Sequence, residues 1–163
     1  MNLHDLEWDK LRHLAIRRDV LAVADRSDVG QAVLPTCASA MVVSPPGRTG
    51  RQVGLQLWVH DRDGKVGLIQ ARPAAVLPLL NVAYYSLLVW DGDDGDELLH
   101  VLDCWQGSCW PGAWVAVELS RCGLDPGLEA IERFADRTGR HAELVERLVV
   151  LPPVRQPSLA AVA

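Results

Sequence analysis

An alternating stretch at residues 52–60 constrains the fold of this chain more than any other feature. Aliphatic residues occupy every second position there: Val53, Leu55, Leu57 and Val59. A period of two places them on one face of a β-strand. Residues 60–65 (HDRDGK) follow as a turn, with Gly64 free to take a positive φ, and residues 66–71 (VGLIQA) return as the partner strand. The pattern predicts a β-hairpin and favours an antiparallel sheet.

The other segments predict a helix at each end and further strands between them. Leucines recur on one side of a helical projection over residues 3–25, which predicts an amphipathic helix. Strands are expected at 33–43, 82–90, 98–106 and 113–120, and residues 72–80 form a short helical or irregular bridge limited by two prolines. Asp125 and Pro126 begin a helix that ends near Gly139. The pattern leaves 142–151 open between helix and strand.

This order of elements predicts an α+β protein. We expect an antiparallel sheet of five or six strands, flanked by the N-terminal helix and by one or two C-terminal helices. The order is similar to that of the profilin-like, GAF-like and roadblock-type scaffolds, a likeness that no motif accompanies. We expect one domain over residues 1–153 and a flexible tail at 154–163.

Charge and hydropathy exclude several classes of protein. The formal net charge of −5 argues against a nucleic-acid binder, whose affinity rests on clustered cations, and gives no attraction to an anionic membrane. No apolar run approaches the roughly 20 residues of a membrane-spanning helix. Residues 1–18 lack the apolar centre of a signal peptide. We therefore expect a cytoplasmic protein with no nucleic-acid or membrane partner.

The segment 103–114 (DCWQGSCWPGAW) raises the question of a metal or redox site. Four residues separate Cys104 from Cys109, not the two of a zinc knuckle, and no second pair follows. If 105–108 were a turn, the two cysteines would face each other across a hairpin at about 4.5–5.5 Å between Cα atoms, which suits a disulfide. We interpret the cysteines as free thiols, keep Cys104 and Cys109 as a candidate redox pair, and expect no metal and no cofactor.

Catalytic and calcium-binding motifs are missing from the sequence. The acidic segment 91–97 (DGDDGDE) has a glycine where a calcium loop needs an oxygen ligand, so we interpret it as a solvated turn. The chain has no G-x-S-x-G, P-loop, G-x-G-x-x-G or H-E-x-x-H motif. Any catalytic site would be assembled from distant residues, and His60 with Glu118 is the pair to inspect.

Tryptophan is the unusual residue of this chain, with six copies against one phenylalanine. Trp58 lies on the strand face opposite the aliphatic residues, and three further tryptophans fall within ten positions. Aromatic side chains with a polar group are favoured at interfaces and pockets. The pattern predicts a binding surface, with a tryptophan core under a helix as the alternative. Its residues would be Gln56, Trp58, His60, Trp105, Trp110 and Trp114.

Two functions follow from these observations. The first is a non-catalytic domain that binds another protein or itself through an aromatic-rich sheet face or edge, most simply as a homo-oligomer. The alternative is a small-molecule-binding domain or small enzyme with a pocket between the sheet and the N-terminal helix. A concave cavity at His60 and Glu118 would favour the alternative.

Overall fold

The computed structural model describes residues 3–24, 36–44, 56–59, 66–80, 84–108 and 113–154. The described strands form a single sheet in the order β3-β4-β2-β1-β5-β6-β8-β7. Their bounds are β1 Asp19–Ala24, β2 Ser39–Ser44, β3 Gln56–Val59, β4 Val66–Gln70, β5 Leu87–Asp91, β6 Trp114–Glu118, β7 Glu143–Val145 and β8 Leu148–Leu151. The run from β4 to β6 is parallel, and antiparallel pairing is confined to β3–β4, β6–β8 and β7–β8.

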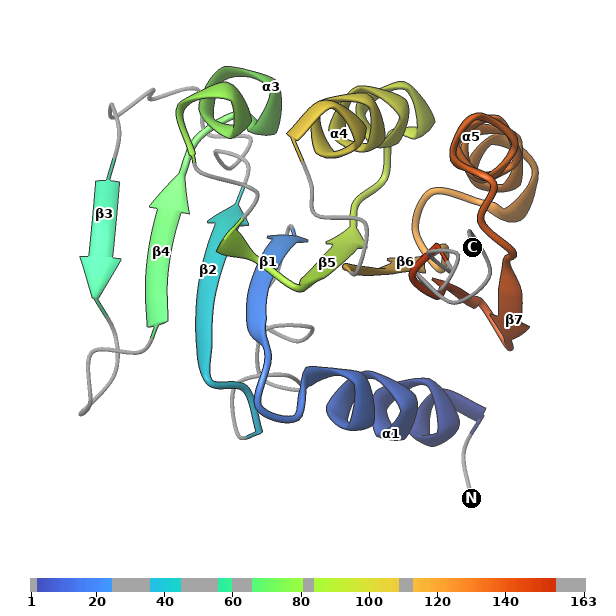
Figure 1. Cartoon of the computed structure of the whole chain (residues 1–163), viewed down its shortest axis with the longest axis horizontal. Helices are drawn as coiled ribbons and strands as arrows, with labels where there is room; N and C mark the ends of the chain where they lie inside the picture. The colour runs from blue at the N-terminus through green and yellow to red at the C-terminus, as the bar shows by residue number, and fades with distance from the viewer. Residues whose placement is uncertain are drawn as a thin grey trace, which may run out of the picture.

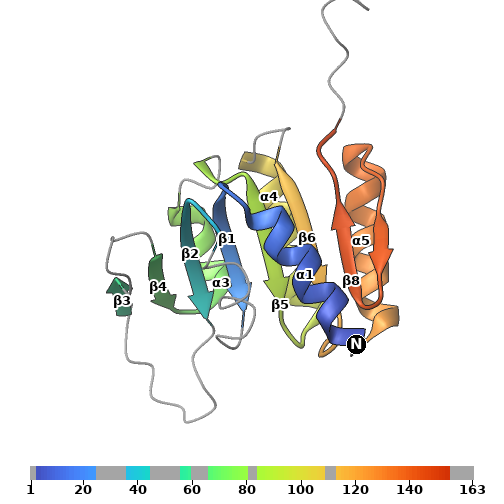
Figure 2. The same cartoon turned by 90° about the horizontal axis from the view of Figure 1, so that it is seen from below.

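Helices cover both faces of this sheet (Figure 1). They are α1 Leu3–Ala15, α3 Pro73–Val76, the 3-10 turn η1 Leu77–Leu79, α4 Gly95–Ser108 and α5 Leu124–Thr138. Figure 1 shows α3, α4 and α5 on one face and α1 on the other. Figure 2 shows α1 crossing the sheet over β5 and β6, with its first turn near the end of β6.

Each face of the sheet has its own hydrophobic core. Leu88, Trp90 and Val117 point toward α4 and α5, whereas Val89 and Ala116 point toward Leu11 and its neighbours on α1. The central strands are therefore buried on both sides, which is the environment of a parallel sheet between helices.

The predicted antiparallel α+β fold is wrong: the protein is an α/β protein with a mostly parallel sheet. The near-continuous apolar runs in β1 (DVLAVA) and β5 (LLVWD) are typical of strands covered on both faces, not of strands with one wet face. Parallel neighbours need a crossover connection, and α4 supplies it between β5 and β6.

Two segments have a different secondary structure from the one predicted, because a helical and a strand spacing of apolar residues were mistaken for each other. Residues 98–106, predicted as a strand, belong to α4, whose buried residues Leu98, Val101, Leu102 and Trp105 recur with a helical spacing. The side chain of Asp94 accepts the N–H of Asp96 at 2.9 Å and caps the start of this helix. The N-terminal helix ends earlier than predicted, at Ala15, and its predicted C-terminal part is β1.

Local patterns predicted several other described elements, with two exceptions. The predicted solvated turn at 91–97 includes the buried end of β5 and the first residues of α4, and α5 begins at Leu124, with Gly123 as its N-cap, instead of at Asp125. The β3–β4 hairpin is confirmed by the antiparallel register that pairs Leu57 with Ile69. Pro73 stands at the start of the helical bridge, and α5 ends at Gly139 with a left-handed φ of 69°. The open segment 142–151 is the β7–β8 hairpin.

Two other predictions concern residues beyond those described. They are the turn at 60–65 and the tail from 155 onward. Within the described ranges, no helix combines the length and the apolar character that crossing a membrane requires.

Candidate site at the carboxyl edge of the sheet

The topology points to one place on the sheet for a ligand. From β1 the chain moves outward to β2 and β4, and it then returns to the other side of β1 as β5. In open α/β sheets, ligands bind at the carboxyl ends of the strands beside this reversal. Here the reversal lies between β1 and β5, whose last residues, Ala24 and Asp91, are partners in the register.

Two buried carboxyl groups end the strands on this edge. Asp91 ends β5 and Glu118 ends β6, the two are register partners, and each is 5% exposed. Strand alternation directs both toward the α1 face, because the residues before them, Trp90 and Val117, lie in the opposite core. Arg121 follows β6, and its Nε lies 3.8 Å from Oδ1 of Asp91.

Glu118 takes part in a hydrogen-bonded group that reaches α1. Its Oε1 accepts the backbone N–H of Ser120 at 2.8 Å, and the Ser120 hydroxyl also donates to it. The Glu118 side chain is hydrogen-bonded to Glu7, which is only 3% exposed. Burial, followed by the bond to Glu7, raises the pKa of Glu118 to about 8, although the Ser120 bonds act in the opposite direction.

On the α4 face of the sheet, the indole of Trp90 lies at the same carboxyl edge. Trp90 is fully buried under α4, and its Nε1 has no hydrogen-bond partner among the described residues. A Cβ on Gly92 would lie 2.7 Å from Cζ2 of Trp90, so only glycine permits this approach of the backbone. The chain thus turns tightly over the indole as it leaves β5.

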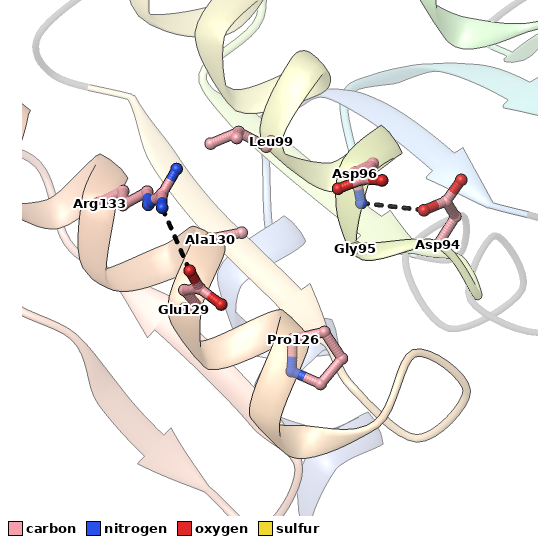
Figure 3. A pocket seen from close by; sticks show the side chains of 8 residues that line it. All are labelled: Asp94, Gly95, Asp96, Leu99, Pro126, Glu129, Ala130 and Arg133. Atoms are coloured by element: carbon pink, nitrogen blue, oxygen red, sulfur yellow. Dashed lines mark hydrogen bonds and ion pairs between the residues drawn. The ribbon is translucent and has the colours of Figure 1, made fainter.

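A groove of about 350 Å³ lies between the first turn of α4 and α5 (Figure 3). Its lining residues are Asp94, Gly95, Asp96, Leu99, Pro126, Glu129, Ala130 and Arg133. Figure 3 shows Arg133 turned toward Glu129, with an ion-pair distance of 3.2 Å. The groove begins close to the carboxyl edge, but it lies on the helical surface, away from Glu118.

The tryptophans of the predicted binding surface do not share one face. Trp105 is 1% exposed in the core below α4 and α5. Trp114 is half-buried on the α1 side, with the Arg18 guanidinium 5.4 Å from its ring centre. Trp105 therefore does not belong to an aromatic-rich sheet face, because α4 is a helix that carries it into the core. Trp114 lies on the sheet face opposite Val115 and Val117, as predicted, and its part in a binding surface stays a prediction. Trp110 lies outside the described residues.

The remaining predicted residues are spread along the sheet. Gln56 and Trp58 belong to β3, which four strands separate from β6. His60 lies beyond the described residues, so its proposed pairing with Glu118 stays a prediction.

The redox hypothesis loses its geometric basis. Cys104 lies within α4 and not in a hairpin, and Cys109 is outside the described residues. Cys104 and Cys122 are free thiols. The described part of the chain brings no three His, Cys, Asp or Glu side chains into an arrangement for a metal ion.

Sequence reasoning singled out Glu118 and missed Asp91 and Glu7. A signal for Asp91 existed, because it directly follows the apolar run of β5 and therefore marks the carboxyl end of a buried strand. No local signal marks Glu7, whose role depends on the crossing of α1 over the sheet.

The sequence matches no family model and no curated protein. Solved structures are nevertheless similar over almost the whole chain. A protein from Corynebacterium glutamicum solved by structural genomics has a TM-score of 0.68 at 14% identity, covering 94% of this chain and 83% of its own. The O-methyltransferase NovP has 0.63 at 12%, covering 91% and 80%. Fibrillarin of Aeropyrum pernix, solved with natively bound S-adenosyl-L-methionine, has 0.59 at 13%, covering 92% and 74%.

These likenesses correct the functional prediction. A non-catalytic dimerising domain built on an antiparallel sheet is contradicted by a fold shared with O-methyltransferases. The small-molecule-binding alternative agrees better with them. The chain has a Rossmann-like α/β fold, which it shares with solved O-methyltransferases.

Proposed function

We propose that this protein binds S-adenosyl-L-methionine at the carboxyl edge of its sheet, beside the β1–β5 reversal, and is methyltransferase-like. The observation that carries the proposal is the similarity of fold over more than nine-tenths of the chain to proteins of that class, one of them with this compound bound. The proposal takes no support from a glycine-rich fingerprint, because the chain lacks G-x-G-x-x-G.

The side chains at this edge fit the chemistry of such a ligand. S-Adenosyl-L-methionine carries a positive sulfonium, an ammonium group and two ribose hydroxyls, and carboxylates are the natural acceptors and counter-charges for these groups. Asp91 ends β5, and the exposed Asp93 and Asp94 follow after Gly92. When bound, the ligand would supply an electrophilic methyl group, and these aspartates would hold its donor groups.

Direct binding tests the proposal. Isothermal titration of the purified chain with S-adenosyl-L-methionine and S-adenosyl-L-homocysteine should show saturable binding at one site, with NAD as the negative control. Asp91→Asn and Asp93→Asn should weaken binding, by about ten- to a hundredfold for a lost charge-assisted hydrogen bond. Asp136→Asn is the matched control, because Asp136 is exposed on α5. Absence of binding at millimolar ligand, or equal binding of NAD, would contradict the proposal.

Methyl transfer is a separate question that a second assay addresses. The chain is incubated with S-adenosyl-L-methionine and a panel of small hydroxyl compounds, and release of S-adenosyl-L-homocysteine is measured. Release that depends on the acceptor supports an enzyme. Binding without release for any acceptor supports a ligand-binding protein on the same fold.

A further inference from the structure

Two buried carboxyl groups meet where the first half of α1 reaches the carboxyl edge. Glu7 is 3% exposed and Glu118 is 5% exposed, and the two side chains are hydrogen-bonded to each other. Two ionised carboxylates have no proton to donate. The hydrogen bond therefore requires that one proton be shared by the pair, which then carries one negative charge.

Backbone donors hold the remaining oxygens of the pair. The N–H of Arg147, in the β7–β8 turn, donates to Oε1 of Glu7 at 2.7 Å. The N–H of Ser120 donates to Oε1 of Glu118 at 2.8 Å. Three segments distant in sequence, namely α1, the end of β6 and the β7–β8 turn, thus converge on one protonated pair.

Charged groups surround the pair on each element packed against it. Asp91 lies beside Glu118 on β5 and has Arg121 at 3.8 Å. The β7–β8 turn contributes Glu146 and Arg147, whose side chains are exposed. A second negative charge on the pair would therefore form in a buried place, where desolvation and the repulsion between the two carboxylates both oppose it.

We propose that the proton shared by Glu7 and Glu118 is a pH-sensitive latch that docks the N-terminal half of α1 on the carboxyl edge of the sheet. The C-terminal half of α1 is held independently by its buried Leu11, Leu14 and Ala15. Loss of the proton leaves two facing carboxylates and loosens only the first half of the helix. Figure 2 shows that this half lies at the end of β6, so the latch controls how that edge is covered. The inference does not depend on what binds there.

The direction of the pH effect follows from the pKa of Glu118, which rises from an ordinary value of 4.5 to about 8 in the folded chain. Between those values the folded chain holds a proton that the unfolded chain has lost. The protonated Glu118 therefore contributes its full stabilisation below pH 4.5. This stabilisation falls as the pH rises from 4.5 to about 8, and it is lost above that pH.

Urea unfolding from pH 5 to 9 tests whether the shared proton stabilises the folded chain. The unfolding constant of the wild type, divided by that of Glu118→Gln, should rise about tenfold per pH unit between roughly pH 5.5 and 7.5 and level off above pH 8.5. Glutamine retains the shape and supplies a permanent donor to Glu7. Glu132→Gln, at an exposed position on α5, should leave the ratio flat. A flat ratio for Glu118→Gln across the range would overturn the proposal.

Hydrogen exchange tests the docking of α1. Exchange of residues 3–10, normalised to the unfolded chain at each pH, should be at least tenfold faster at pH 9 than at pH 6.5, whereas residues 11–15 should change little. In Glu118→Gln the two pH values should give the same protection, and Glu7→Gln provides the same comparison if the first variant does not fold. Equal protection of residues 3–10 in the wild type at both pH values would overturn the latch.

Discussion

Gly127 sits inside α5, where alanine normally stabilises a helix by up to about 1 kcal/mol relative to glycine. The surroundings reverse that expectation. A Cβ at this position would overlap Cδ2 of Leu119 and lie 3.3 Å from Sγ of Cys122. Leu119 is fully buried and cannot move without disturbing the core. The first turns of α5 thus approach the segment after β6 closely because residue 127 has no side chain.

Gly127→Ala should therefore lower the free energy of unfolding, by about 1–3 kcal/mol, as is usual when a packed core receives an extra methyl group. Urea unfolding measures the change. Glu132→Ala, on the exposed side of the same helix, should stay within about 0.5 kcal/mol of the wild type. A gain in stability from Gly127→Ala would show that Leu119 can repack.

At the scale of elements, α4 explains why the fold was predicted incorrectly. The β3–β4 hairpin was predictable because its strand period and turn are local. The segment 98–106 contains enough apolar residues to resemble a strand, yet only the helical period places Leu98, Val101, Leu102 and Trp105 on one side. Reading α4 as a strand removed the crossover and made residues 98–106 an antiparallel hairpin partner of β5. That error changed the predicted fold class. It also meant that no edge formed by the carboxyl ends of parallel strands was predicted.

Substitutions along α4 distinguish the two periods directly. Val101→Ala and Leu102→Ala should each lower the free energy of unfolding, by roughly 1–4 kcal/mol, because both side chains are buried. His100→Ala, at an exposed position, should change it by less than about 0.5 kcal/mol. A strand would place His100 and Leu102 on one face and Val101 on the other. Equal effects at positions 100 and 102 would therefore contradict the helix.

The candidate site was predictable only in part, for the same reason. Glu118 ends a strand with a clear pattern, so its place could be inferred. Its contact with Glu7 joins the first helix to the sixth strand and depends on the packing of α1 across the sheet. Such long-range contacts leave no trace in the period of a single segment.

Among the strands whose burial is described, those at the centre of the sheet are more deeply buried than β7 at its edge. Every residue of β5 is buried, and β1 is buried from its second residue onward. In contrast, β7 has three residues and one neighbouring strand, and Leu144 is 59% exposed. Amides at a sheet's centre exchange only on global unfolding, whereas those at an open edge exchange through local opening.

Native-state hydrogen exchange should therefore rank the strands, with the amides of β1 and β5 exchanging slowest and those of β7 fastest. The same measurement bears on self-association, which stays a prediction. If β7 were as protected as β5, its outer edge would have to be paired with another chain, because nothing in the described part of this chain covers it. Protection by a second copy would decrease on dilution. Rapid exchange of β7 at every concentration would instead mean that this edge is open and that any oligomer forms elsewhere on the molecule.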